Sequence, residues 1–310
     1  MVIYHYCMSI RVYCNVIVYT NCKDGSFCAI WLLCLWITIR LRKTWFDTEN
    51  KTTTKAKTSI NQLKDKDDYL EEMDTLNKLK VDMDDPRLIS LIRNYWIENP
   101  SDQPYNLTHP HVIDPSIGQA AFVDNRLNFK NDGFFVECGA LDGETRSNSL
   151  IFERTRSWNG LLVEADPSNY ELVKKKNRKA FTINACLSIY PYPVKMQFKK
   201  NFNEGKIVQD ENSKGESTVH VQCFPFYSIM KAINVTHIDF FSLDVEGAEL
   251  QVLQTIPFGK LDIEMMTVEF KHVPGGETQL KNFVENNGYS SLIKMSHYNN
   301  LANDIIFRKK

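Results

Sequence analysis

From about residue 85 onward, short apolar runs alternate with segments in which apolar residues recur at helical spacing. The first such segment is RLISLIRNYWI, and a second helix is predicted from Gly118 to about Phe129. The apolar runs predict strands at GFFVEC, NGLLVEA, AFTINACL, VKMQF, STVHVQCF, IDFFSLDV, EMMTVEF, GYSSLIK and NDIIFRK. Further helices are predicted at NSLIFERT and at residues 167–178, 248–254 and 278–285. Buried runs separated by helices are typical of a mostly parallel sheet covered on both faces, so we predict a doubly wound α/β fold.

The N-terminal part of the chain follows a different pattern. After a tail at residues 1–25, an apolar run begins at Ser26 and is followed at once by RLRK. A helix that spans a bilayer needs about 20 apolar residues. Residues 26–41 are therefore a candidate transmembrane anchor if Arg40 and Arg42 extend their charged ends to the membrane surface. The alternative is the apolar region of a signal peptide, although no small-residue cleavage site follows it.

The next segment, residues 42–84, is rich in Lys, Thr, Asp and Glu and has few apolar side chains. Such a segment cannot bury enough apolar surface to offset the entropy lost on ordering. We therefore predict a polar stalk, with a transient helix from Asp67 to Lys80, in front of a globular domain at residues 85–310.

The charges of the whole chain nearly cancel, because 37 basic and 38 acidic residues give a formal net charge of −1. No overall field attracts a polyanion, and we expect no nucleic-acid partner. More basic residues lie directly after the candidate anchor than in the tail before it. Because positively charged flanks tend to stay in the cytosol, this difference favours a cytosolic domain. Three glycosylation sequons lie at Asn50, Asn106 and Asn234. Such sequons are modified only in the lumen, but three is about the number that chance gives, so they do not decide the location of the domain.

Eight cysteines are present, and five of them precede residue 35. None shows the paired spacing of a zinc site, so no structural metal is expected. The domain contains Cys138, Cys186 and Cys223. Either all three are reduced core thiols or one pair is bridged, in which case Cys186 and Cys223 are the candidate pair.

Two predicted strand ends carry residues suited to a nucleotide-like ligand. In ECGALDGE, Gly139 and Gly143 permit a tight turn and the close approach of a ligand. The GxxxG spacing differs from the dinucleotide-binding GxGxxG, so a plain turn is the alternative. The next strand, in GLLVEADP, ends at Glu164, which can accept both hydroxyls of a ribose, whereas Asp166 fits better as a helix N-cap.

Two later strand ends carry clustered titratable groups. In SLDVEGAEL, the side chains of Asp244, Glu246 and Glu249 repel one another unless a cation, a metal or a need for protons accounts for them. Glu249 can alternatively be a first-turn acid that the helix dipole favours. The run TVEFKHV adds Glu269 and His272, for which a buried structural Glu and a surface His are the simpler interpretations.

Together these stretches resemble class I, Rossmann-like S-adenosylmethionine-dependent methyltransferases, and more closely the FkbM type. The resemblance is carried by FVECGALDG, LLVEADP and IDFFSLDVEGAELQVL and covers roughly residues 116–310. It implies that the cofactor S-adenosylmethionine is held by the glycine turn and by the acid after the second strand, that is by Glu137, Gly139, Gly143 and Glu164.

The same resemblance implies methyl transfer to a hydroxyl group, an in-line displacement that needs positioning and a base. Asp244 and Glu246 then line the reaction site, with Asp244 as the base and Glu246 or His272 as alternatives. Two positions depart from the pattern. Leu141 stands where the family commonly has Asn. The strand end that starts at Ala185 contains no acidic residue, whereas many class I enzymes place an acid there, near the adenine amine.

Longer stretches are also similar to the insect Star-like proteins; they are DPRLISLIRNYW, PYNLT, DPSIGQ, RSWNGLLVEADP, NRKAF and VQCFPFYSIM. This second resemblance implies a single-pass membrane protein of the secretory pathway with a lumenal domain, located in the endoplasmic reticulum, Golgi, endosome or plasma membrane. It also implies an alternative function, the vesicle-mediated export of a growth-factor precursor as a client, without catalysis.

Overall fold

In the computed structural model the chain divides into two units, Met1–Ser59 and Ile60–Lys310. The structure describes residues 6–8, 11–13, 66–202, 204–208, 218–297, 299 and 302–310. In the first unit, β1 (Tyr6–Met8) pairs antiparallel with β2 (Arg11–Tyr13). The candidate anchor at residues 26–41 lies outside the described residues. Within the described ranges, no helix has the length and apolar character needed to cross a membrane.

The second unit is built on an eight-stranded sheet with the order β13-β14-β12-β11-β4-β5-β6-β3. The strands are β3 (Ile97–Glu98), β4 (Phe134–Cys138), β5 (Asn159–Glu164), β6 (Phe181–Asn184), β11 (His237–Leu243), β12 (Asp262–Glu269), β13 (Tyr289–Ser296) and β14 (Asn303–Lys309). The five strands from β12 to β6 are parallel, while β3, β13 and β14 pair antiparallel at the edges. The predicted doubly wound α/β fold is confirmed, with a mixed sheet.

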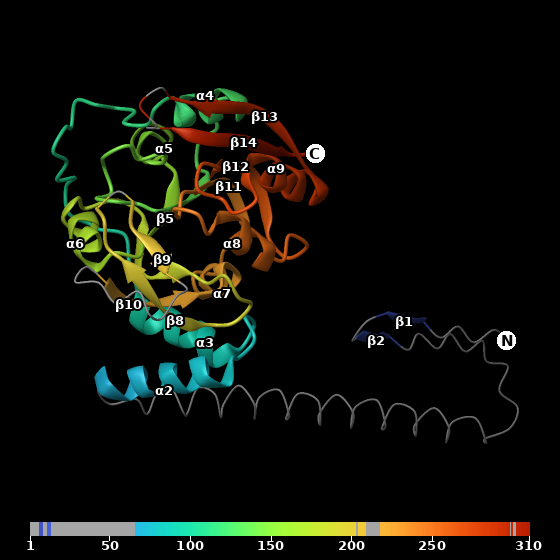
Figure 1. Cartoon of the computed structure of the whole chain (residues 1–310). Coiled ribbons are helices and arrows are strands. Elements are labelled where there is room, and N and C mark those ends of the chain that lie inside the picture. The colour runs from blue at the N-terminus through green and yellow to red at the C-terminus, as the bar shows by residue number, and fades with distance from the viewer. Residues whose placement is uncertain are drawn as a thin grey trace, which may run out of the picture. The chain divides into compact units, whose positions relative to one another are not determined.

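Helices cover both faces of this sheet (Figure 1). On one face lie α4 (Gln119–Arg126), α5 (Leu150–Arg156) and α6 (Pro167–Lys175). The other face is covered by α3 (Pro86–Leu91), its π-helical continuation η1 (Ile92–Trp96), α7 (Phe226–Ala232), α8 (Glu249–Thr255) and α9 (Gly276–Asn286). Neighbouring strand residues divide between the two cores, as Phe135 and Val136 do, because side chains alternate along a strand.

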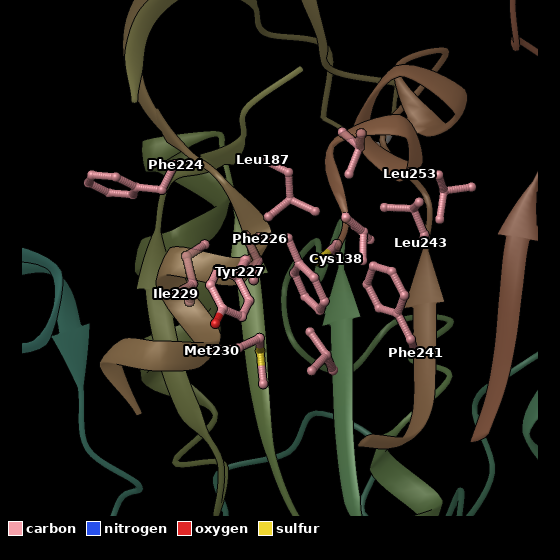
Figure 2. Close-up of a cluster of buried hydrophobic side chains, with 14 of the residues drawn as sticks. Cys138, Leu187, Phe224, Phe226, Tyr227, Ile229, Met230, Phe241, Leu243 and Leu253 are labelled. Carbon is pink, nitrogen blue, oxygen red and sulfur yellow. The ribbon is translucent and has the colours of Figure 1, made fainter. Parts of the chain in front are cut away.

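The core beneath α7 is rich in aromatic side chains. Figure 2 shows Phe226 of this helix facing Phe241 of β11, and their rings stack with centroids 4.6 Å apart. Ile229 and Met230 continue the apolar face of α7 in the same cluster. This helix was not predicted, because FYSIMKA directly follows a predicted strand and is too short for a clear helical period.

A separate four-stranded sheet is inserted between β6 and α7. Its order is β7-β10-β8-β9, with β7 (Cys186–Leu187), β8 (Val194–Lys199), β9 (Lys206–Val208) and β10 (Thr218–Phe224). The predicted single strand AFTINACL is divided at Ala185, so that its second half joins this small sheet. Cys186 and Cys223 face each other in the β7–β10 register and form a disulfide, while Cys138 is a buried free thiol. Of the two alternatives left open, the bridged candidate pair is therefore the one found, and the alternative of three reduced thiols is wrong.

The helix predicted from Asp67 to Lys80 is confirmed, but it packs on the folded unit instead of lying in a polar stalk. Helix α2 (Lys66–Leu79) carries Tyr69, Met73 and Leu76 along one face, and the last two side chains are fully buried. The Tyr69 ring stacks on Tyr95 with centroids 4.3 Å apart. The stalk therefore does not extend beyond residue 65. Although the apolar residues of this segment are few, their spacing of four and then three positions places them on one face of a helix, which can pack on the domain.

The contribution of α2 can be tested by comparing two leucines of this helix. Leu76→Ala should lower the free energy of unfolding by about 2–5 kcal/mol, because the side chain is 0% exposed and its removal leaves a cavity. Leu79→Ala, the same change at a position that is 61% exposed, should change it by less than about 0.5 kcal/mol. Chemical denaturation measures both values, and equal effects would contradict the packing of α2.

Candidate functional site

A cavity of about 150 Å³ lies at the carboxyl ends of the parallel strands. The chain runs from β4 outward to β5 and β6, and then returns to the other side of β4 as β11. Ligands of open α/β sheets bind at such a reversal of strand order. Six of the seven residues predicted for the site line this cavity, namely Glu137, Gly139, Glu164, Asp244, Glu246 and His272.

The two glycines of the predicted turn have structural tasks. Gly139 has a φ of +83°, and a Cβ atom at this position would lie 2.0 Å from the carbonyl oxygen of Asp244. The glycine therefore permits contact between two backbone segments, at the ends of β4 and β11. Gly143, with a φ of +78°, does not line the cavity, and a Cβ there would face Val173 of α6. A bulky residue at Gly139 would thus displace the backbone itself.

Glu137 holds the loop that follows β4. Its buried carboxylate accepts hydrogen bonds from the Ser147 hydroxyl at 2.8 Å, from the Asn148 amide at 2.7 Å and from the Ser149 hydroxyl. The cavity beside it contains an acceptor without a donor among the described residues, the buried Oδ1 of Asn148. Glu137 therefore contributes to the site mainly by fixing this loop, a task that the sequence did not indicate.

Arg178 supports the same loop from behind and was not identified from the sequence. Its guanidinium donates to the Ser149 hydroxyl at 3.0 Å and to the carbonyl oxygen of Gly143. It also pairs with Glu153 at 2.9 Å, and both side chains are fully buried. Only the tertiary structure brings these residues together, because nothing in NRKAF distinguishes this arginine from a solvated one.

Glu164 ties the ends of β4 and β5 together. Its carboxylate accepts hydrogen bonds from the amides of Leu141 and Asp166, each at 2.8 Å. Burial raises the pKa of Glu164 to about 7, although these amides oppose the shift. Asp166 is the N-cap of α6, as expected, and accepts from Ser168 at 2.7 Å. Leu141 has a φ of +55°, a left-handed conformation that Asn adopts more readily than Leu.

Asp244 lies at the floor of the cavity. Its side chain is exposed to the cavity, and among the described residues no donor forms a hydrogen bond with its carboxylate. The surrounding protein deprives the group of hydration, and nearby carboxylates repel its charge; together they raise the pKa of Asp244 well above its usual range. The repelling groups are Glu246, Asp304, Glu269 and Glu249.

Glu246 and His272 form a pair beside Asp244. The Nδ1 atom of His272 lies 2.7 Å from the Glu246 carboxylate and 3.9 Å from that of Glu269. Burial raises the pKa of Glu246, while His272 opposes this shift. The three predicted catalytic residues are therefore brought together at one end of the cavity.

Glu249 secures the loop that carries them. This fully buried carboxylate accepts hydrogen bonds from the amide of Val245 at 2.9 Å and from that of Gly247 at 3.0 and 3.1 Å. Burial raises the pKa of Glu249 to about 7. Oxygens of Asp244, Glu249 and Glu269 lie within 4.8 Å of one another, a spacing that a cation could bridge.

The inserted sheet also lines the cavity, which the sequence did not predict. Its lining residues include Phe198 and Ile207, and Ala185, Cys186 and Leu187 line the cavity from the end of β6 and from β7. Gly205 allows Phe198 to approach, because a Cβ there would lie 2.7 Å from the ring. The lining thus combines acids from the strand ends of the main sheet with apolar side chains from the inserted sheet.

Comparison with known families identifies the domain that contains the cavity. Residues 137–291, half of the chain, match the family model described as the methyltransferase FkbM domain. The chain belongs to the FkbM methyltransferase family. The matched segment runs from the end of β4 into β13, so it includes Glu137, Glu164, Asp244 and His272. No curated protein matches the chain.

Several solved structures are distantly similar to this FkbM domain protein. A methyltransferase FkbM from Methylobacillus flagellatus is 14% identical, with a TM-score of 0.39; the match covers 58% of this chain and only 44% of that one. A TehB-like SAM-dependent methyltransferase from Corynebacterium glutamicum is 13% identical over 62% of this chain and 88% of its own, with a TM-score of 0.35. TrmK from M. capricolum, in complex with S-adenosyl-homocysteine, is 10% identical over 61% and 68%, with a TM-score of 0.34.

The buried carboxylates predict how stability depends on pH. Since burial raises the pKa of Glu249 from 4.5 to about 7, the folded state binds its proton more tightly than the unfolded state does. Its contribution to stability is therefore complete below pH 4.5 and is lost as the pH rises through 7. Glu249→Gln should reduce the fall in unfolding free energy between pH 5 and pH 8 by up to roughly 3 kcal/mol.

Chemical denaturation at the two pH values measures this change. Glu171→Gln is the matched control, because the Glu171 side chain is 60% exposed and should leave the pH dependence as in the wild type. The same pH dependence for Glu249→Gln and the wild type would contradict the assignment.

Proposed function

We propose that this protein is an S-adenosylmethionine-dependent O-methyltransferase. The observation that carries the proposal is the position of the cavity, at the strand reversal and within the segment that matches the FkbM family. Its lining combines carboxylates with apolar side chains. A cofactor that combines a charged amino acid, a ribose and a flat heteroaromatic ring fits such a lining.

The residues present fit this cofactor. Each oxygen of Glu164 accepts one backbone amide, and a carboxylate oxygen has two acceptor sites, so the group can still accept from a ribose diol. The adenine ring fits against Ala185, Phe198 and Ile207, where apolar contact takes the place of the acid absent from this strand end. The unpaired Oδ1 of Asn148 is available for a donor of the ligand.

When bound, the cofactor supplies a methyl group on a sulfonium, which is open to in-line displacement. The protein has to position a hydroxyl group and remove its proton. Asp244 takes this role, because it faces the cavity and no hydrogen-bond donor among the described residues occupies its carboxylate. Glu246 and His272 flank it and orient the acceptor.

The location we propose is the secretory pathway, in the endoplasmic reticulum, Golgi, endosome or plasma membrane. Residues 26–41 form the membrane anchor, residues 1–25 the tail, and the domain lies in the lumen. The bond between Cys186 and Cys223 supports a lumenal domain, because disulfides form and persist in oxidising compartments. This argument outweighs the basic residues that follow the anchor.

The proposed roles predict separate effects on binding and turnover. Wild-type protein should bind S-adenosylmethionine in calorimetry. Glu164→Gln should weaken binding about 10- to 100-fold, through the loss of a hydrogen bond to a charged group. Asp244→Asn should leave the Kd unchanged and lower the formation of S-adenosylhomocysteine about 100- to 10,000-fold, since it removes the base.

The exposed Glu171→Gln variant serves as the control for both measurements, and thermal unfolding confirms that each variant is folded. If the folded wild-type protein does not bind the cofactor, the proposal fails. Undiminished turnover by the Asp244→Asn variant would show that Asp244 is not the base, and it would not affect the proposed cofactor site.

The size of the cavity favours a second candidate function. At about 150 Å³ it is smaller than the roughly 300–1,000 Å³ of pockets that enclose small ligands. This supports a non-catalytic role on a methyltransferase scaffold, as the similarity to Star-like proteins implies. In this role the protein escorts a client, such as a growth-factor precursor, by vesicle transport from the endoplasmic reticulum through the Golgi to the plasma membrane.

Client transport separates the two functions. If the protein acts as an escort, Asp244→Asn should support surface delivery of a co-expressed growth-factor precursor as well as the wild type does. Cys223→Ser is the control that should lose transport, because removal of a native disulfide lowers the free energy of unfolding by about 2–5 kcal/mol. Loss of transport in a folded Asp244→Asn variant would instead connect transport with catalysis.

A further inference from the structure

The turn between α7 and β11 contains a sequon, Asn234-Val235-Thr236, on the surface of the domain. The side chains of Asn234 and Thr236 are both exposed. Among the described residues, no group forms a hydrogen bond with the side-chain amide of Asn234. We propose that Asn234 carries an N-linked glycan, an inference that rests on the lumenal location proposed above and is independent of catalysis.

The backbone of this turn explains why asparagine is tolerated here. Asn234 has a φ of +59° and follows Ile233, the C-cap of α7. Its amide donates to the carbonyl of Lys231 at 3.2 Å, and that of Val235 donates to Met230 at 3.0 Å. These two bonds form a Schellman motif, in which Gly or Asn occupies the left-handed position. The motif accounts for the asparagine but gives no reason for the exposed Thr236, which completes the sequon.

The other sequon within the described residues is held against the protein. The side-chain amide of Asn106 donates to the carbonyl of Lys175 at 2.9 Å, and its backbone amide donates to Lys176 at 3.0 Å. The hydroxyl of Thr108 accepts from the Lys176 ammonium at 2.7 Å, which in turn contacts Glu144 at 2.6 Å. A sugar on Asn106 would have to extend from a nitrogen already placed against the end of α6, whereas Asn234 projects freely.

A glycan on Asn234 would leave the cavity open. Asn234 precedes β11, while Asp244 follows the carboxyl end of this seven-residue strand. At about 3.3 Å per residue, the strand separates the two positions by roughly 20 Å. The modification is therefore compatible with either of the functions proposed above.

The chemical step requires a donor of the lumen, a lipid-linked diphosphate oligosaccharide. A bond forms between Nδ2 of Asn234 and C1 of the first sugar, and the bond from C1 to the phosphate oxygen breaks. The lipid diphosphate leaves with the bonding electron pair, and Nδ2 releases one proton. No redox partner is needed.

Three variants separate the sequon from the turn. Asn234→Gly removes the acceptor but keeps the residue that the left-handed position prefers, so the fold should be at least as stable. Thr236→Ala removes the sequon and keeps Asn234, and Thr236→Ser preserves the sequon. The full chain is expressed in eukaryotic cells with a reporter sequon appended after Lys310, and its mobility is compared before and after endoglycosidase treatment.

We expect the wild type and Thr236→Ser to carry one glycan more than Asn234→Gly and Thr236→Ala, and Asn106→Gln to match the wild type. Equal mobility of all variants, with a modified reporter, would overturn the assignment of Asn234 and leave the lumenal location intact. An unmodified reporter would overturn the location and, with it, this inference. A mobility change in Asn106→Gln would show that the contacts of Asn106 do not exclude modification and would overturn the geometric argument.

Discussion

The candidate site depends on the contact between two strand ends that are far apart in the sequence. Gly139 at the end of β4 lies against the carbonyl of Asp244 at the end of β11, with no room for a Cβ atom between them. The amide of Asp244 also donates to the carbonyl of Cys138 at 3.1 Å. Since both loops begin from this contact, any displacement of it would separate the acids of one loop from the turn of the other.

Carboxylates dominate the site, but most of them hold backbone. Glu137, Glu164 and Glu249 each accept amides of a loop at the edge of the sheet, and their buried charges are offset by these dipoles. Asp244 differs, because no described donor satisfies it. The distinction between acids that build the site and an acid available for chemistry is therefore one of hydrogen bonding, which residue type alone does not express.

Much of the fold was predictable, because apolar runs such as FFVEC and IDFFSL mark buried parallel strands whose carboxyl ends must lie together. This also placed six of the seven predicted residues around one cavity. Gly143 does not line this cavity, and its spacing does not reveal that a Cβ there would face Val173 of α6. Arg178 and Phe198 were missed because their roles arise only from contacts between distant segments. The helix of α2 was predicted, but its packing was not, because its few apolar residues gain a partner only in the folded domain.

The disulfide joins the first and last strands of the inserted sheet, since Cys186 begins β7 and Cys223 lies near the end of β10. The insertion is thus a covalently closed module whose entry and exit are fixed at one point on the main sheet. Sequence changes inside it can alter the apolar part of the cavity lining without disturbing the strands that carry the acids. The residues that shape the ligand site and those that supply its charges therefore lie on separate parts of the fold.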